Sequence, residues 1–147
     1  MTVRLRSAEP LDGPRIFDLL LEAQSIEWPE VAVNAAKARK EIADVIRDGM
    51  AIVAEENEEV VGSVGLRLSD WWFSDELFWL MPWIYVRKDR RRSRIGVKLI
   101  LAVRRFAVRQ PVPVIPTLFT RTDTTRKSVL FSRYFEPLGG AYMVRRP

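Results

Sequence analysis

Ten consecutive uncharged residues, Leu77–Val86, end directly at a strongly basic octapeptide, Arg87–Arg94. An uncharged run of this length is typical of a strand covered on both faces, so we expect it to form the central strand of a sheet. Pro82 within the run has no N–H to donate, which predicts a bulge or a splayed edge at that point. After the octapeptide, apolar residues recur at helical spacing, at Ile95, Leu99, Ile100, Val103, Phe106 and Ala107. This part of the chain is therefore predicted to be a strand, a basic loop and a helix in succession.

The other elements are predicted from hydrophobic periodicity and capping residues. Asp12 is suited to cap a first helix and Asn34 a second, with Gly49 at the end of the second. Two antiparallel strands are expected around a polar turn at residues 55–59. In chain order we expect a strand at Val3–Ala8, the two helices, strands at Met50–Ala54 and at residues 63–68, the strand and helix described above, a strand at Val114–Thr120, a helix from Asp123 or Thr124 through Phe135, and a last strand at Ala141–Arg145.

The chain of 147 residues has the length of one domain, and we expect residues 1–147 to form a single one. No stretch approaches the ~18 apolar residues of a membrane span, and the N-terminus lacks the apolar segment of a signal peptide. We therefore expect a cytoplasmic protein with no membrane partner. The chain has no Cys and no His, which excludes disulfides, thiol nucleophiles and thiolate metal sites, so we expect no metal site. Catalysis must then use carboxylates, Tyr, Lys, Ser or Thr, backbone amides or a cofactor.

The positive charge is concentrated in one place. The chain has 24 basic and 19 acidic residues, and the octapeptide holds six of the basic residues and one acid. The rest of the chain is therefore neutral. A protein that binds a duplex usually spreads its cations over a face that follows many phosphates, whereas one focus suits a compact polyanion. A loop that enters a helix also offers unpaired backbone N–H groups and the positive end of the helix dipole to a phosphate. The alternative interpretation is a solvated basic loop.

The stretch from Val86 to Ile100 resembles the acetyl-CoA loop of the GNAT superfamily of N-acetyltransferases. The family pattern is a strand-ending Val, four residues, and then Arg/Gln-x-x-Gly-x-Gly/Ala. Val86, Arg91 and Gly96 match it, whereas Arg94 replaces the central glycine. The family's order of elements also covers nearly the whole chain. The resemblance implies an α/β protein with the acyl-CoA N-acyltransferase fold, a mixed, mostly antiparallel sheet with helices on both faces. The Arg-Arg-Ser version of the loop also looks like that of acetyltransferase-like proteins of bacteriophages.

The resemblance further implies acetyl-CoA as the cofactor. Backbone N–H groups from Arg92 to Val97 would hold the pyrophosphate, and the pantetheine arm would pair with strand backbone like an added strand. We expect Arg94 to adopt helical dihedrals and to turn its guanidinium outward onto phosphate. Ser128 stands where the family often has Asn, although solvation of a helix surface is the alternative. The residues expected to bind the cofactor are Ile84, Tyr85, Val86, Arg91, Arg92, Ser93, Arg94, Ile95, Gly96, Val97, Lys98 and Ser128.

The catalytic residues are less clearly marked. The family often places a Glu about six residues before the motif Val, where this chain has Leu80, so Glu76 is the candidate base, acting through water. A solvated turn carboxylate is the alternative. Phe135 occupies the position of the family's usual Tyr, which leaves Tyr134 as the candidate acid, or else as a packing residue. Other carboxylates lie near the strand's entrance or between the first two helices, at Asp70, Asp75, Glu22 and Glu27.

Three functions are compatible with the sequence. The leading one is a CoA-dependent N-acetyltransferase that acts on a small-molecule or peptide amine by direct transfer, because no Cys is present to form a covalent intermediate. The second is a catalytically weak acyl-CoA-binding protein of the same fold. The third is a small nucleic-acid-binding protein that uses residues 87–94, which the neutrality of the rest of the chain disfavours. An exposed Trp71–Trp72 pair would suit a homodimer contact, and Trp83 is a candidate for cofactor or acceptor contact.

Overall fold

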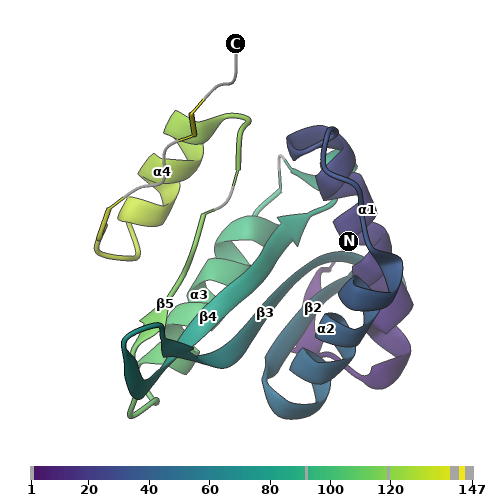
Figure 1. Ribbon diagram of the computed structural model, residues 1–147. Coiled ribbons are helices and arrows are strands. Elements are labelled where there is room, and N and C mark those ends of the chain that lie inside the picture. The colour runs from purple at the N-terminus through teal and green to yellow at the C-terminus, as the bar shows by residue number, and fades with distance from the viewer. Residues whose placement is uncertain (1, 92, 119, 140–142, 145–147) are drawn as a thin grey trace.

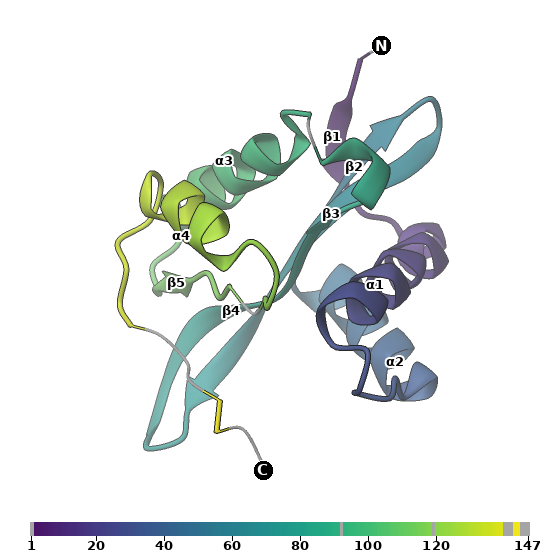
Figure 2. The ribbon, with the colours of Figure 1, turned by 90° about the horizontal axis from the view of Figure 1, so that it is seen from above.

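The computed structural model describes residues 2–91, 93–118, 120–139 and 143–144. Five strands form one sheet in the order β1-β2-β3-β4-β5 (Figure 1). Neighbours from β1 to β4 are antiparallel, and β5 is parallel to β4, so the sheet is mixed and mostly antiparallel, as predicted. Helices α1 and α2 cover one face and α3 and α4 lie on the other (Figure 2). The strands are β1 (Arg4–Ser7), β2 (Met50–Glu56), β3 (Glu59–Trp71), β4 (Ser74–Val86) and β5 (Val114–Ile115).

Helix α1 (Gly13–Glu27) and helix α2 (Ala35–Asp48) form where the sequence predicts them. Asn34 caps α2, because its side chain accepts a hydrogen bond from the N–H of Lys37. Asp12 stands at the N-cap position of α1, as predicted, but its side chain makes no capping hydrogen bond. It ends a 3-10 turn, η1 (Pro10–Asp12), and its carboxylate accepts from the N–H of Glu9 and from the Arg6 guanidinium instead. Arg6 of β1 therefore binds the carboxylate that would otherwise cap the helix.

The central strand is β3, and not β4 as the uncharged run predicts. Residues 60–66 of β3 are all buried, whereas only Trp79 and Met81 of β4 are. The uncharged run misleads because it shows only that charged residues are absent. The apolar residues of β4 are mostly half-buried or exposed, since β5 pairs with β4 at only two positions among the described residues. In β3 small residues weaken the strand signal, yet Gly65 is required, because a Cβ there would stand 2.4 Å from the ring of Trp83.

The bulge predicted at Pro82 is present. Gly65 pairs with Trp83 and Arg67 pairs with Leu80, so Met81 and Pro82 together stand opposite one residue of β3. On its other side β4 pairs with β5 only at Trp79–Val114 and Leu80–Ile115. Strand β5 is therefore much shorter than the predicted Val114–Thr120. Beyond Leu80, in the part of the chain that the structure describes, no strand pairs with this edge of β4. We call this divergence after Leu80 and Ile115 the β4–β5 fork.

Two apolar cores lie on the two faces of the sheet. Ile95, Leu99 and Val103 of α3 (Ile95–Ala107) pack on one face, and Ile16, Phe17 and Leu19 of α1 pack on the other. Successive residues of β4 point to opposite faces, so Ile84 and Val86 join the α3 core while Trp83 and Tyr85 join the α1 core. The end of β4 is thereby fixed from both sides.

The C-terminal elements are shorter than predicted. Helix α4 (Thr124–Ser132) ends three residues before the predicted Phe135. Of the predicted last strand, residues 141, 142 and 145 lie outside the described residues, and Met143 and Val144 form no strand. None of the helices within the described ranges is long and apolar enough to span a membrane.

Candidate functional site

The N-terminus of α3 presents unpaired backbone donors. The N–H of Ile95 donates to the hydroxyl of Ser93 at 3.3 Å, and the first intrahelical bond is from the N–H of Lys98 to the carbonyl of Arg94. Among the described residues, the N–H groups of Gly96 and Val97 have no acceptor. Orphan donors at the positive end of a helix of this length favour an anion.

The loop does not need a glycine at position 94. Arg94 has φ −83° and ψ 8°, in the bridge region beside the helical one, and its side chain is exposed. The predicted helical dihedrals of Arg94 are therefore wrong in ψ, although its negative φ is one that any residue adopts, and the direction of its guanidinium stays a prediction. Gly96 is also unconstrained by the fold, since a Cβ there would meet only Val86 Cγ2 at 3.8 Å. Any requirement for glycine at position 96 must therefore come from a ligand that approaches the backbone.

The basic octapeptide is less free to bind an anion than its sequence indicates. Arg87 binds Glu59 at 3.0 Å and Asp89 at 2.7 Å, and Arg90 binds Glu56. Arg91 turns inward, donating to the Tyr85 hydroxyl at 2.9 Å, and lies over that ring. Arg92 lies outside the described residues. The side chains that remain without a protein partner in the described part of this loop are those of Lys88 and Arg94. Glu56 and Glu59 of the β2–β3 turn, distant in sequence, thus pair with Arg90 and Arg87.

Tyr85 connects the end of β4 to α1. Its hydroxyl donates to Glu22 Oε2 at 2.8 Å, and the N–H of Lys88 donates to the same oxygen at 3.0 Å. Burial and the bond to Glu22 raise the pKa of Tyr85 to about 12. The Tyr85 hydroxyl is therefore protonated at neutral pH and acts as a donor to the carboxylate.

Glu27, at the end of α1, binds the segment that follows β5. Its carboxylate accepts from the N–H of Arg121 at 2.7 Å, the N–H and hydroxyl of Thr122 at 3.0 and 2.6 Å, and Lys127 Nζ at 2.8 Å. Burial opposes its ionisation, but the bonds from Lys127 and Thr122 prevail and lower the pKa of Glu27 to about 2. Glu27 is therefore ionised at neutral pH and links α1 to the segment that leads into α4.

Of the two candidate catalytic residues, Glu76 lies away from the β4–β5 fork. Glu76 is exposed near the β3–β4 turn, where its N–H donates to the hydroxyl of Ser74. It precedes Leu80 by four residues, about 13 Å of strand. Tyr134 follows the end of α4 and is half-buried. The neighbouring Phe135 packs against Phe131 and the α3 core, so this position serves packing.

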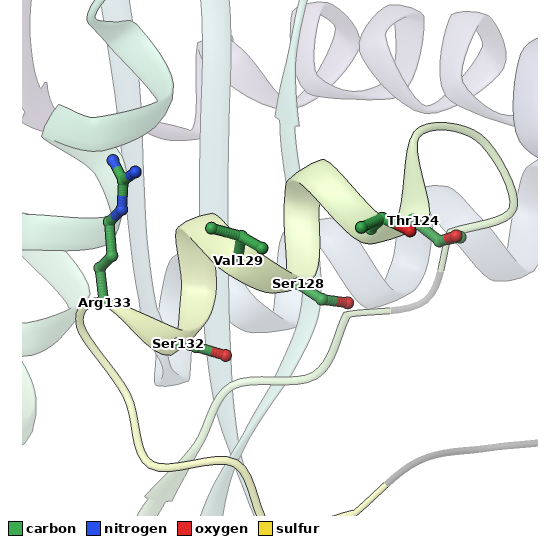
Figure 3. A pocket seen from close by; sticks show the side chains of 6 residues that line it. Thr124, Ser128, Val129, Ser132 and Arg133 are labelled. Carbon is green, nitrogen blue, oxygen red and sulfur yellow. The ribbon is translucent and has the colours of Figure 1, made fainter.

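Ser128 lies on the exposed surface of α4. It lines a pocket of about 520 Å³ together with Thr124, Thr125, Val129, Ser132 and Arg133 (Figure 3). The hydroxyls of Thr124, Ser128 and Ser132 recur every four residues and so share one helix face. This places Ser128 on a polar surface, away from the apolar contacts of Phe131.

The sequence reasoning missed the roles of Glu22, Glu27 and Lys127. The two carboxylates are visible near the loop between the first helices, but their partners lie 63 to 100 residues away in the chain. Only the topology brings these partners together. The predicted Trp71–Trp72 pair is not exposed as a unit. Trp72 is 95% exposed, whereas Trp71 packs against Phe73 and Phe78.

Comparison with solved structures finds the same fold in known proteins. Comparison with curated protein sequences finds no match. A possible acetyltransferase from Clostridium difficile 630 is similar in structure, with a TM-score of 0.71 at 14% identity, over 100% of this chain and 99% of that one. Ribosomal-protein-alanine N-acetyltransferase from Brucella melitensis has a TM-score of 0.67 at 15% identity, over 99% and 100% of the two chains.

Aminoglycoside N-acetyltransferase AAC(6')-Iy, solved in complex with CoA, has a TM-score of 0.70 at 14% identity, over 99% of this chain and 95% of that one. These likenesses confirm the predicted fold. The sequence profile of the acetyltransferase (GNAT) family matches residues 14–133. The chain therefore belongs to the acetyltransferase (GNAT) family, whose members transfer an acetyl group from acetyl-CoA to an amine.

Proposed function

We propose that this acetyltransferase binds the diphosphate of acetyl-CoA at the N-terminus of α3 and passes the acetyl group directly to an amine at the β4–β5 fork. The observation that carries the proposal is the position of the fork. The unpaired edge of β4 ends at Val86, and ten residues later Gly96 and Val97 offer N–H groups with no acceptor in the described chain. One ligand with an extended arm and an anionic end fits both features.

Different groups of residues around these donors would bind different parts of the cofactor. The N–H groups of Gly96 and Val97 would bind the diphosphate, flanked by Ser93 and Ile95, whose N–H groups donate to the Arg90 carbonyl and the Ser93 hydroxyl. Arg94 and Lys98, both exposed, would face the remaining phosphate. The edge of β4 at Ile84, Tyr85 and Val86 would pair with the pantetheine arm, as an added strand pairs with an exposed edge. Arg91 supports the site indirectly, since its guanidinium holds Tyr85. Arg92 and Ser128 complete the proposed set from the motif and from α4.

Acetyl transfer requires an uncharged amine. The amine nitrogen attacks the thioester carbonyl, the carbon–sulfur bond breaks, and the thiolate leaves with a proton returned to it. Backbone N–H groups near the bulge at Pro82 would polarise the carbonyl. Glu76 remains the proposed base, acting through water, and Tyr134 the proposed acid. Conservative replacement tests both, because Glu76→Gln removes the group that accepts a proton and Tyr134→Phe removes the hydroxyl that donates one, each with little change in shape.

The proposed acceptor is a small-molecule or peptide amine. The family neighbours include an aminoglycoside N-acetyltransferase, which supports the small-molecule class. A homodimer remains a prediction that rests on the exposed Trp72 and Phe73 at the β3–β4 turn. Light scattering of the wild type and of Trp72→Ser measures it directly.

Calorimetric titration with CoA, followed by thiol release from acetyl-CoA over a panel of amines, tests the proposal. Saturable binding with turnover on at least one amine supports it. Binding without turnover on any amine favours the catalytically weak CoA-binding alternative. Absence of CoA binding together with a steep salt-dependent affinity for oligonucleotides overturns it in favour of nucleic-acid binding.

A further inference from the structure

Two carboxylates of α1 bind the two sides of the β4–β5 fork. Glu22 accepts from the hydroxyl of Tyr85 and from the N–H of Lys88, at the end of β4. Glu27 accepts from the N–H groups of Arg121 and Thr122, in the segment that continues β5. In the parallel register of β4 and β5, where Trp79 pairs with Val114, residue 121 would stand beside residue 86. Beyond Leu80 and Ile115 the two segments do not pair with each other in the described part of the chain, and at this level of the sheet each of them is bound to α1 instead.

The attachment at Glu27 is the more extensive of the two. Lys127 Nζ binds Glu27 Oε1 and also the hydroxyl of Thr120 at 2.6 Å. The Arg121 guanidinium lies 4.8 Å from the ring of Trp28 and pairs with Glu30. Glu27 is only 8% exposed, so an uncompensated charge there would be costly. The cluster therefore fixes residues 120–127 to the end of α1 at several points.

These ties are not needed to hold α1 on the sheet. The helix already buries Ile16, Phe17 and Leu19 against β2, β3 and α2 in its first half. Glu22 and Glu27 lie in its second half, beyond that apolar patch. Their partners are the two segments that diverge at the fork, so the ties determine how far those segments stand apart.

The separation suits one extended chain. Glu22 and Glu27 are five positions apart in α1, which corresponds to about 7.5 Å along the helix axis. Two strands with one extended chain between them stand about 9.6 Å apart, twice the spacing of neighbouring strands. The rise of α1 between the two residues exceeds one strand spacing of about 4.8 Å, which fits ties to two segments that do not pair with each other, and among the described residues β4 and the segment after β5 do not pair.

We infer that Glu22 and Glu27 are positioning residues that hold the β4–β5 fork open to the width of one pantetheine arm. The inference rests on the proposed function, because it names the ligand that occupies the fork. It assigns to α1 a second role besides covering the sheet, and it predicts that loss of a tie weakens binding of the arm while the phosphate end of the cofactor binds as before.

The test compares CoA with adenosine 3′-phosphate 5′-diphosphate, which is CoA without the pantetheine arm. Calorimetry gives the dissociation constant of each for the wild type and for Lys127→Met, Thr122→Val and Glu22→Gln. Lys40→Met is the matched control, because it breaks the exposed Lys40–Asp44 pair on α2. Circular dichroism and thermal unfolding confirm that each variant is folded. Thr122→Val removes a single hydroxyl, and Thr122→Ser restores it.

Each of the three tie variants, Lys127→Met, Thr122→Val and Glu22→Gln, should bind CoA about tenfold more weakly than the wild type does. Their dissociation constants for adenosine 3′-phosphate 5′-diphosphate should stay within about twofold of the wild-type value. Thr122→Ser and Lys40→Met should behave as the wild type. A wild type that binds CoA, with the same preference in all folded tie variants, overturns this inference alone. A wild type that binds neither compound overturns the proposed function and the inference with it.

Discussion

Replacing Val97 by proline removes one backbone donor from the proposed diphosphate site without breaking α3. Val97 is the third residue of the helix, and its N–H has no acceptor among the described residues. Proline in a first helical turn gives up only a hydrogen bond that the helix does not make. Gly96 precedes it and tolerates the restricted backbone that proline imposes on its neighbour. The variant should therefore fold like the wild type.

The expected loss follows from the charge of the ligand. A hydrogen bond to a charged group contributes roughly 1.5–3 kcal/mol, which corresponds to about a 10- to 150-fold weaker affinity when the donor is absent. Calorimetric titration with CoA measures the loss, and circular dichroism confirms the helix. Val97→Ala is the control, since it removes the side chain and keeps the N–H. If folded Val97→Pro binds CoA as tightly as Val97→Ala, the diphosphate does not lie on this helix end and the reasoning is refuted.

Four further perturbations have definite expected outcomes. Gly65→Ala should destabilise the protein by about 1–3 kcal/mol in denaturant melts, because its Cβ would stand 2.4 Å from the Trp83 ring; unchanged stability would contradict the packing described. Gly96→Ala should raise stability by about 0.5–1 kcal/mol and weaken CoA binding, whereas equal CoA affinity would show that no ligand approaches this backbone. Because the pKa of Glu27 falls from 4.5 to about 2 on folding, its contribution of about 3 kcal/mol is complete above pH 4.5 and disappears as pH falls towards 2. Urea melts over this range should show that slope, and Glu27→Gln should lose it; a wild type with no acid-dependent loss would contradict the tie. Trp72→Ser should leave the stability of the single folded chain unchanged within about 0.5 kcal/mol in melts at low protein concentration, since the side chain is 95% exposed there; a large loss at low concentration would contradict that exposure, whereas a loss that grows with protein concentration is the result expected of the predicted homodimer.

Local pattern was sufficient for most elements of the fold. The apolar stripe of α3, the Asn34 cap and the effect of Pro82 all depend on neighbours within a few residues, and all three appear as predicted. The central strand could not be predicted in this way. Its identity depends on which strands flank it, and the small residues of β3 that allow close packing against Trp83 also weaken its hydrophobic signal.

The same distinction between local and long-range contacts applies to the candidate site. The helix N-terminus with its orphan donors follows from one continuous segment, so the sequence predicts it. The sequence does not predict the partners of the basic loop, because Glu56 and Glu59, which bind Arg90 and Arg87, come from the β2–β3 turn. The ties of Glu22 and Glu27 depend on chain separations of 63 residues or more, which periodicity does not record.

A crystal structure of the protein grown with CoA tests the central claim most directly. The account predicts diphosphate oxygens within about 3 Å of the N–H groups of Gly96 and Val97, and a pantetheine arm bonded to the β4 edge at residues 84–86. A cofactor found on another surface, with these two N–H groups facing solvent and the fork closed by side chains, would contradict it.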